Sequence, residues 1–364
     1  MAFSIIPYNG DSMMKPWPAL ADRAFCLTND SRQDESIFFY DFSPAAAYRT
    51  VIVLVHGLGD EADSWRHLIP LLNKRGYRVL APDLPGFGRS VALGKINLKK
   101  HAAAVLQLIE AACPGAKVIL AGNSLGAIVA ADLAFKKPGL ASGLIMIDAS
   151  IPGGVKTPGL FALAGMLFSR KWYRSYRTDP ERAWASLYPY YAGLDAMPGE
   201  DKAFLKRRVM ARVQSSAQEE AFFQTQRSIV WAFISAASKI TQKIEKFDGK
   251  TLLIWGENDR IIPISSAAAF KAGLTKAELK TIPGAGHLPQ QEKPQELAKL
   301  IADFADGLLY CAEPQSSQKK LSNRFCKIYN CYFSDRRRCK IINHFFEFCG
   351  NEYAVPFVAT FSAD

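Results

Sequence analysis

The 364-residue sequence has no apolar run that approaches the ~18 residues needed to cross a membrane, so it predicts no integral membrane segment. The first 20 residues contain Asn9, Asp11 and three prolines, which differs from the basic start and apolar stretch of a secretory signal. Of seven cysteines, only Cys26 and Cys113 precede residue 300. The main part of the chain therefore lacks a disulfide framework, which favours a reducing, cytoplasmic location.

A concentrated basic patch is also missing, although the formal net charge is +11. The lysines and arginines are scattered, and no recognisable nucleic-acid-binding module accompanies them. We therefore expect no nucleic-acid partner, and at most a weak attraction to anionic membrane surfaces. The hydrophobic content of 49% and the charged content of 22% are typical of a globular chain. Its length suits one large α/β domain with an insertion, or two modest domains.

The chain is organised around residues 117–127, which read KVILAGNSLGA. The apolar run 118–121 indicates a strand, residues 125–137 indicate a helix, and Gly122–Gly126 between them form a G-x-S-x-G pattern. A strand, a sharp turn and a helix are the context of a nucleophile elbow, where flanking glycines let neighbouring backbone pass close by. The first N–H groups of the helix favour a developing negative charge. Ser124 is therefore the predicted nucleophile.

Other apolar runs alternate with helical spacing along the chain. They occupy residues 51–55, 77–84, 143–147, 251–255 and 279–283. This alternation predicts an α/β fold with a mostly parallel, doubly wound sheet and right-handed crossovers. In such sheets the ligand site lies beyond the carboxyl ends of the strands. Glycine-containing or acidic loops follow Val55, Leu84, Ala121, Trp255 and Pro283. We therefore expect the site at that edge.

Changes in composition predict the domain boundaries. The expected parts are an irregular lead-in (1–33), a first core part (34–150), a helical cap (151–246), a second core part (247–309) and an extension (310–364). Residues 36–42 predict a strand near a sheet edge. The cap is rich in aromatic residues, most of which we expect to pack it against the core. The extension is basic and cysteine-rich, its spacings match no zinc pattern, and it is expected to lie outside the fold.

A serine hydroxyl needs an adjacent base, which is itself oriented by an acid. His287, in the loop after the last predicted strand, can supply the base, and Asp259, after the preceding strand, can supply the acid. An oxyanion hole needs two backbone N–H groups aimed at one point. Leu125, directly after the serine, and Leu58, after the apolar run 51–55, are the predicted donors.

Five segments carry a family resemblance. They are HGLGD at 56–60, DLPGFGRS at 83–90, GNSLG at 122–126, WGENDRIIP at 255–263 and GAGHLPQQEKP at 284–294. Over residues 34–309 the chain resembles the α/β-hydrolase superfamily of the capped type, whose chain order is serine, acid, histidine. The resemblance implies a Ser124–Asp259–His287 triad, with no cofactor and no metal. His56 and Asp83 are interpreted as groups that shape their own loops.

The resemblance leaves two points open. Some members of the superfamily place the acid after the earlier strand, so Asp148 is an alternative to Asp259, which the WGENDRIIP context favours. Ala127 stands where many relatives carry a second glycine after the elbow. The serine at position 124 argues against haloalkane dehalogenases and epoxide hydrolases, which use an aspartate nucleophile.

GNSLG together with DLPGFGRS is similar to carboxylesterases and to carbon–carbon hydrolases of aromatic ring-cleavage pathways. The sequence therefore predicts a serine hydrolase that cleaves a small-molecule ester of a small to medium apolar acid through an acyl-enzyme. One alternative is a carbon–carbon hydrolase of vinylogous diketone acids, with Arg174 or Arg177 holding the carboxylate. Another is a non-catalytic ligand-binding protein on the same fold. The oligomeric state stays open.

Overall fold

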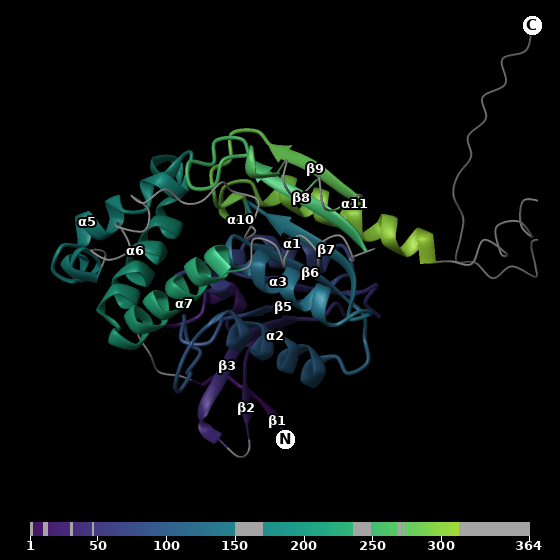
Figure 1. The fold of residues 1–364 in the computed structure, drawn as a ribbon, viewed down its shortest axis with the longest axis horizontal. Coiled ribbons are helices and arrows are strands. Elements are labelled where there is room, and N and C mark those ends of the chain that lie inside the picture. The colour runs from purple at the N-terminus through teal and green to yellow at the C-terminus, as the bar shows by residue number, and fades with distance from the viewer. Residues whose placement is uncertain are drawn as a thin grey trace, which may run out of the picture. The chain divides into compact units, whose positions relative to one another are not determined.

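The computed structural model describes residues 3–9, 14–29, 32–45, 47–149, 170–235, 249–267, 271, 274 and 276–312. Within these residues nine strands form one sheet in the order β1-β2-β3-β5-β4-β6-β7-β8-β9 (Figure 1). The strands are β1 (Phe3–Pro7), β2 (Ala24–Asn29), β3 (Arg32–Phe42), β4 (Val51–Val55), β5 (Arg78–Pro82), β6 (Val118–Asn123), β7 (Ala141–Ile147), β8 (Lys250–Gly256) and β9 (Ala277–Ile282). Neighbouring strands from β5 to β9 pair in parallel, whereas β1, β2 and β3 pair antiparallel.

Helices cover both faces of the sheet. They are α1 (Leu68–Lys74), α2 (Leu98–Ala112), α3 (Leu125–Lys136), α5 (Pro180–Ala185), α6 (Gly199–Gln214), α7 (Ser216–Ser235), α10 (Pro289–Glu292) and α11 (Pro294–Ala312). Along β4, Val51, Val53 and Val55 join a core with α2 and α3. Ile52 and Leu54 join a core with α1 and α11 on the other face. A strand buried on both sides is continuously apolar, so the prediction of a doubly wound, mostly parallel sheet is confirmed.

Residues 1–33 were expected to form an irregular lead-in, but the structure shows regular elements there. It contains β1, β2 and a short 3-10 helix η1 (Pro18–Arg23), and β1 and β2 lie outside β3, which is therefore not at the edge. In β2, Leu27 lies in the core on the α2 side, while Cys26 packs on the opposite side. Burial on both faces leaves no period-2 alternation in a run of six residues, so the sequence pattern did not show this strand.

Residues 170–235, which follow β7 and precede β8 in the chain, form a helical layer (teal to green in Figure 1). Besides α5, α6 and α7 it holds the 3-10 helices η3 (Tyr176–Thr178), η4 (Tyr188–Tyr190) and η5 (Leu194–Ala196). It has its own apolar cluster, which includes Tyr176, Trp184, Leu205 and Val209. These residues occupy the middle of the predicted cap, and its proposed limits at 151 and 246 lie outside the described residues.

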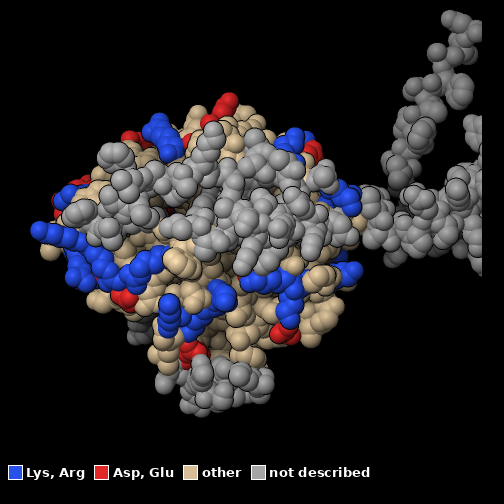
Figure 2. Space-filling view, viewed as in Figure 1, with Lys and Arg blue, Asp and Glu red and all other residues tan. Residues whose placement is uncertain are grey.

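The chain divides into two compact units at Leu308 and Leu309, and the described part ends at Ala312. The rest of the predicted extension, 313–364, lies outside the described residues. None of the helices in the described ranges is both long and apolar enough to cross a membrane. On the face shown in Figure 2, lysine and arginine side chains are spread over the visible surface rather than gathered into one patch.

Deletion of residues 313–364 is expected to leave the core stable. The buried residues of α11, including Leu297, Ile301 and Ala305, all precede the cut. The melting temperature should change by less than about 3 °C, roughly the shift that 1 kcal/mol produces in a domain of this size. Calorimetry of both proteins tests this, and deletion from Leu297 onward serves as the destabilising control. A large loss of stability on deletion of 313–364, or zinc bound only by the full chain, would contradict the proposed extension.

Candidate active site

The turn at Ser124 has a backbone conformation that side-chain-bearing residues rarely adopt. Ser124 joins β6 to α3 with φ 53° and ψ −114°. The backbone of Gly126 in α3 passes very close to the end of β4, because a Cβ on Gly126 would lie 1.9 Å from the carbonyl oxygen of Val55. Only glycine fits there. The turn therefore places Ser124, which is partly exposed, at the carboxyl edge of the sheet beside the first turn of α3.

His287 and Asp259 form a buried pair. Nδ1 of His287 lies 2.8 Å from Oδ2 of Asp259, and their side chains are 4% and 1% exposed. The other carboxylate oxygen of Asp259 accepts hydrogen bonds from the N–H groups of Ile261 (2.7 Å) and Ile262 (3.0 Å). These two bonds hold the carboxylate in place, so that it can orient the imidazole and stabilise its protonated form.

The loop that carries His287 is tied to the elbow. The side-chain amide of Asn123 donates to the carbonyl oxygen of His287 at 3.0 Å, and the N–H of Ser124 donates to Ile147 at 3.0 Å. The structure records no hydrogen bond between the Ser124 hydroxyl and His287. Such bonds are often long without substrate and tighten when it binds. The structure thus brings together the neighbourhoods of all three residues that the sequence singled out.

The two N–H groups predicted to bind an oxyanion lie in the elbow and in the loop after β4. Among the described residues, the backbone N–H groups of Leu58 and Leu125 have no hydrogen-bond acceptor. The loop of Leu58 lies against the elbow, since a Cβ on Gly57 would be 3.6 Å from the Cβ of Ser124. His56 shapes this loop as expected: its Nδ1 contacts the Gly57 carbonyl oxygen at 2.8 Å, and its Nε2 accepts from the N–H of Leu84 at 2.8 Å.

Asp83 also acts within its own region, as predicted. Its carboxylate pairs with Arg89 at 2.7 Å and accepts the N–H of Ala62 at 2.6 Å, and it is fully buried. These bonds join the loop after β5 to the 3-10 helix η2 (Ala62–Trp65). Asp83 is thereby committed to loop structure rather than to the site.

Asp148 lies next to the pair but has no bond to the histidine. It follows β7, is fully buried and has φ 46°. Its Oδ1 accepts the N–H of Gly256 at 2.8 Å, while no donor in the described part of the chain bonds its buried Oδ2. Burial and the neighbouring Asp259 raise the pKa of Asp148 well above its ordinary value. The geometry favours Asp259 as the acid that contacts His287.

Asp148, Asp259 and His287 are also the one group in the described residues that could converge on a metal ion. One ligand atom from each lies within 4.8 Å of the others. A hydrogen bond of 2.8 Å already joins His287 to Asp259, so these two side chains pair with each other directly.

Glu292 is a functional candidate that sequence reasoning missed. Its Oε1 accepts the N–H groups of Ala192 (2.8 Å) and Gly193 (2.9 Å), and its Oε2 accepts that of Gly286 (2.7 Å). The N–H of His287 donates to the carbonyl oxygen of Tyr190 at 2.9 Å. Glu292 therefore fastens the loop of His287 to the helical layer of residues 170–235. Only its place in the QQEKP segment could have indicated this role.

Buried ion pairs join the same layer to the core. Arg208 of α6 binds the Glu61 carboxylate, and Arg66 binds Asp201 of α6 at 2.6 Å. All four residues are buried. Burial by itself would raise the pKa of Glu61, but Arg208 lowers it to about 2. Glu61 is therefore charged at neutral pH, and the ion pair holds α6 against η2.

Aromatic side chains from this layer lie beside the candidate site. The Tyr190 ring centroid is 5.9 Å from that of His287. A Cβ on Gly59 would lie 3.1 Å from the ring of Phe222, so α7 covers the loop that holds Leu58. Tyr173 packs on Phe222 at 5.5 Å. The walls near the predicted reacting groups are therefore largely apolar.

The arginines of this layer differ in their pairing. Arg174 and Arg177, the expected carboxylate ligands, both bind Glu219, at 2.9 Å and 2.6 Å. Arg212 has no ion pair or side-chain hydrogen bond with any described residue. Burial raises the pKa of Tyr190, and the charge of Arg212 partly offsets that effect. Arg212 is thus the arginine of α6 whose charge acts on the tyrosine beside His287.

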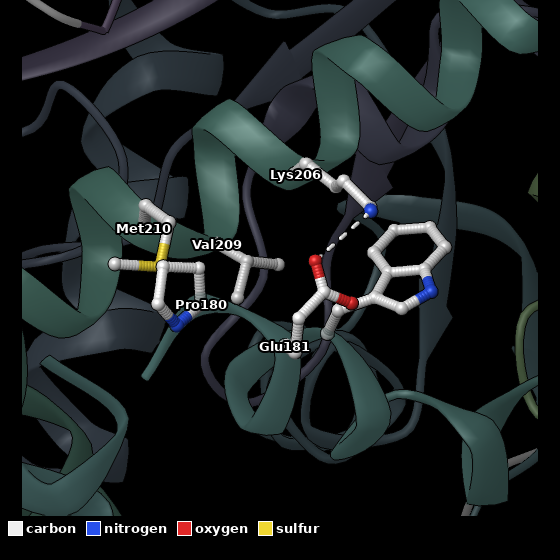
Figure 3. Close-up of a pocket in the computed structure, with 6 residues that line it drawn as sticks. Pro180, Glu181, Lys206, Val209 and Met210 are labelled. Atoms are coloured by element: carbon white, nitrogen blue, oxygen red, sulfur yellow. Dashed lines mark ion pairs between the residues drawn. The ribbon is translucent and has the colours of Figure 1, made fainter. Parts of the chain in front are cut away.

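A small cavity lies between α5 and α6, away from these groups (Figure 3). Its volume is about 30 Å³. It is lined by Pro180, Glu181, Trp184, Lys206, Val209 and Met210. Lys206 and Glu181 form an ion pair across it at 3.6 Å. A space of this size holds about one water molecule, so it is no substrate site.

A parallel sheet covered on both faces, a strained serine turn, and an aspartate and a histidine after successive strands define a hydrolase of the α/β type. The model of the Alpha/beta hydrolase family matches residues 52–300. The chain belongs to this family, and the resemblance found in its sequence is confirmed.

Named relatives fit this assignment. The chain is similar to the uncharacterized hydrolase YugF of Bacillus subtilis (strain 168), with 26% identity over 267 residues that cover 70% of this chain and 90% of the relative. It is 24% identical over 291 residues to 2-hydroxy-6-oxononadienedioate/2-hydroxy-6-oxononatrienedioate hydrolase 2 of Pseudomonas putida, covering 77% and 95%. A solved thermophilic esterase from Thermogutta terrifontis shares the fold, with a TM-score of 0.61, 22% identity, and 77% and 97% of the two chains covered.

Replacement of Arg208 by Met is expected to lower the free energy of unfolding by about 3–5 kcal/mol, because Glu61 would be left buried and charged without its partner. Urea unfolding measures the change. Arg207→Met is the matched control, because Arg207 lies next to it on α6 with an exposed side chain, and it should cost less than about 0.5 kcal/mol. Equal effects of the two changes would show that the buried pair does not hold the layer in place.

Proposed function

We propose that this protein is a serine hydrolase that cleaves carboxylic esters of small to medium apolar acids. The observation that carries the proposal is the buried His287–Asp259 pair, whose loop is hydrogen-bonded to the residue before Ser124. A binding protein needs no such pair beside a strained serine. The low cysteine content of the first 300 residues supports a cytoplasmic location as part of the proposal.

The proposed reaction has two halves. The Ser124 hydroxyl attacks the ester carbonyl while His287 takes its proton and Asp259 stabilises the charged imidazole. The N–H groups of Leu58 and Leu125 bind the oxyanion. His287 then protonates the leaving alcohol, which leaves an acyl-enzyme. In the second half His287 activates a water molecule, which releases the acid and frees Ser124.

The apolar side chains beside the site support an apolar acyl group. Tyr190 and Phe222 lie next to His287 and the Leu58 loop. Such a wall binds acyl chains through buried surface, and each buried methylene contributes about 0.8 kcal/mol. Binding through surface area does not require a charged group on the substrate.

A second candidate is hydrolysis of a carbon–carbon bond in a vinylogous diketone acid. Arg212 favours it, because its charge acts on Tyr190 and its side chain has no ion pair or hydrogen bond among the described residues, so it can bind a carboxylate. The Pseudomonas putida relative is named for hydrolysis of such a dienedioate. Arg174 and Arg177, which were expected to take this role, are already paired with Glu219.

Replacement of Ser124 by Ala is expected to leave a folded protein whose kcat falls by about 10³-fold or more, because triad members act as a unit. The measurements are hydrolysis of p-nitrophenyl butyrate and labelling by a fluorophosphonate, and both should be lost. Ser142→Ala is the matched control. Ser142 lies at the start of β7, at the opposite end from the candidate site, and its hydroxyl donates to the carbonyl oxygen of Val118. Turnover that survives in Ser124→Ala would refute the serine mechanism, and a wild-type protein that is never labelled would favour a binding protein.

Replacement of Arg212 by Met separates the two candidate reactions. An esterase should show kcat/KM rising about fourfold per methylene from acetyl towards medium acyl esters, with little effect of Arg212→Met. A carbon–carbon hydrolase should be poor on all esters and should bleach a yellow diketone acid rapidly. Loss of a charged hydrogen bond to its carboxylate should then raise KM about 10- to 100-fold in Arg212→Met. Arg207→Met is the control in both assays.

A further inference from the structure

Two buried carboxyl groups meet behind His287, and they are bonded very differently. Asp259 accepts two backbone N–H groups and contacts the imidazole at 2.8 Å. Among the described residues, Asp148 accepts a single N–H, from Gly256, and no donor bonds its second, buried oxygen. One oxygen of each carboxyl and a ring nitrogen of His287 lie within 4.8 Å of one another.

Two carboxylates this close and this buried cannot both be charged without a large cost. Asp259 has the donors that stabilise a negative charge, so the proton belongs on Asp148. The charged groups that act most strongly on Asp148 are Asp259 and Glu292, both acidic, and His287 completes the cluster. Burial, followed by the charge of Asp259, raises the pKa of Asp148. The hydrogen bond from Gly256 lowers the pKa, but burial and Asp259 outweigh it, so a neutral Asp148 is favoured.

We propose that Asp148 is a protonated carboxyl that donates a hydrogen bond from its Oδ2 to Asp259, and so acts as a positioning residue for the triad. This inference rests on the proposed roles of Asp259 and His287. The backbone serves the arrangement: Asp148 has φ 46°, and its N–H donates to Ile254 at 2.9 Å. The carboxyl reaches the end of β8, where its Oδ1 accepts the N–H of Gly256, three residues before Asp259.

A neutral donor stabilises the charge on Asp259 without adding a second negative charge behind the imidazole. A second carboxylate there would place two like charges side by side behind the imidazole, which burial makes costly. Asp148 thus gives Asp259 an additional hydrogen bond while His287 stays free to accept the serine proton.

Asparagine tests this directly, since it keeps the acceptor for Gly256, supplies a neutral donor to Asp259 and tolerates positive φ. Asp148→Asn should keep kcat/KM for p-nitrophenyl butyrate within about threefold, with the acid limb of the pH profile unmoved. Asp148→Ala removes the donor, so kcat/KM should fall about 10- to 100-fold, as for other groups that orient a functional side chain. Its acid limb should also move to higher pH, which a merely structural defect would not cause. Asp259→Asn should abolish activity.

Unfolding supplies a readout that does not depend on catalysis. A carboxyl that stays protonated in the native state but ionises in the unfolded state holds an extra proton when folded. Native stability then falls as pH rises between the unfolded and folded pKa values of Asp148. Asparagine lacks this proton. The ratio of the folding equilibrium constant of Asp148→Asn to that of the wild type should therefore rise about tenfold per pH unit from about pH 4 up to the folded pKa of Asp148.

Three results would overturn the inference. One is an acid limb of Asp148→Asn displaced to lower pH, since that means a negative charge was removed. Another is a kcat/KM and an acid limb of Asp148→Ala that equal those of the wild type. The third is a stability difference between Asp148→Asn and the wild type that does not grow with pH. Failure of the proposed function looks different: activity and fluorophosphonate labelling would survive in Ser124→Ala or Asp259→Asn, while the stability comparison would still report the proton on Asp148.

Discussion

Two close crossings of the backbone determine where every group of the candidate site lies. At the first, Gly126 passes Val55 with no room for a side-chain carbon, which holds α3 against the end of β4 and bends the chain at Ser124. At the second, a Cβ on Gly256 would lie 2.0 Å from the carbonyl oxygen of Gly286. That contact joins the loops after β8 and β9, and Asp259 meets His287 there. These close main-chain contacts position the loops of the candidate site, and the side chains of the loops then form the site.

The helical layer of residues 170–235 is bound to this frame by charge as well as by apolar contact. Two residues of α6 form buried ion pairs with the core: Arg208 pairs with Glu61, and Asp201 pairs with Arg66. Buried pairs require close geometry, because a displaced partner leaves a charge without water or counterion. Glu292 adds a second connection, from the loop of His287 to residues 192 and 193. Movement of the layer and placement of the predicted base are therefore coupled.

The sequence predicted those features that depend on local pattern. Continuous apolar runs identified the buried parallel strands, and the loops at their ends pointed to Ser124, Asp259 and His287. It did not predict β2, because packing on both faces of the sheet leaves no alternation of apolar and polar residues along this strand.

Nor could it predict which charges pair. Glu61 and Arg208 are 147 residues apart, and Arg174 and Arg177 look as available in sequence as Arg212. Those distinctions depend on tertiary contacts that no local spacing encodes.

The pairing of charges in the helical layer also bears on the substrate. Arg208 is neutralised by Glu61, and Arg174 and Arg177 share Glu219, so these cations add little field to the site. Arg212 has no such partner in the described residues, and its charge acts on Tyr190 beside His287. An apolar ester leaves that cation to water, whereas an acid with a terminal carboxylate replaces the water with an ion pair. In the proposed mechanism the same residues would serve both substrates, because the reacting carbonyl would meet the same serine, base and oxyanion donors. Under the proposed function, the choice between ester and carbon–carbon substrates would depend on this cation and on how far solvent reaches it.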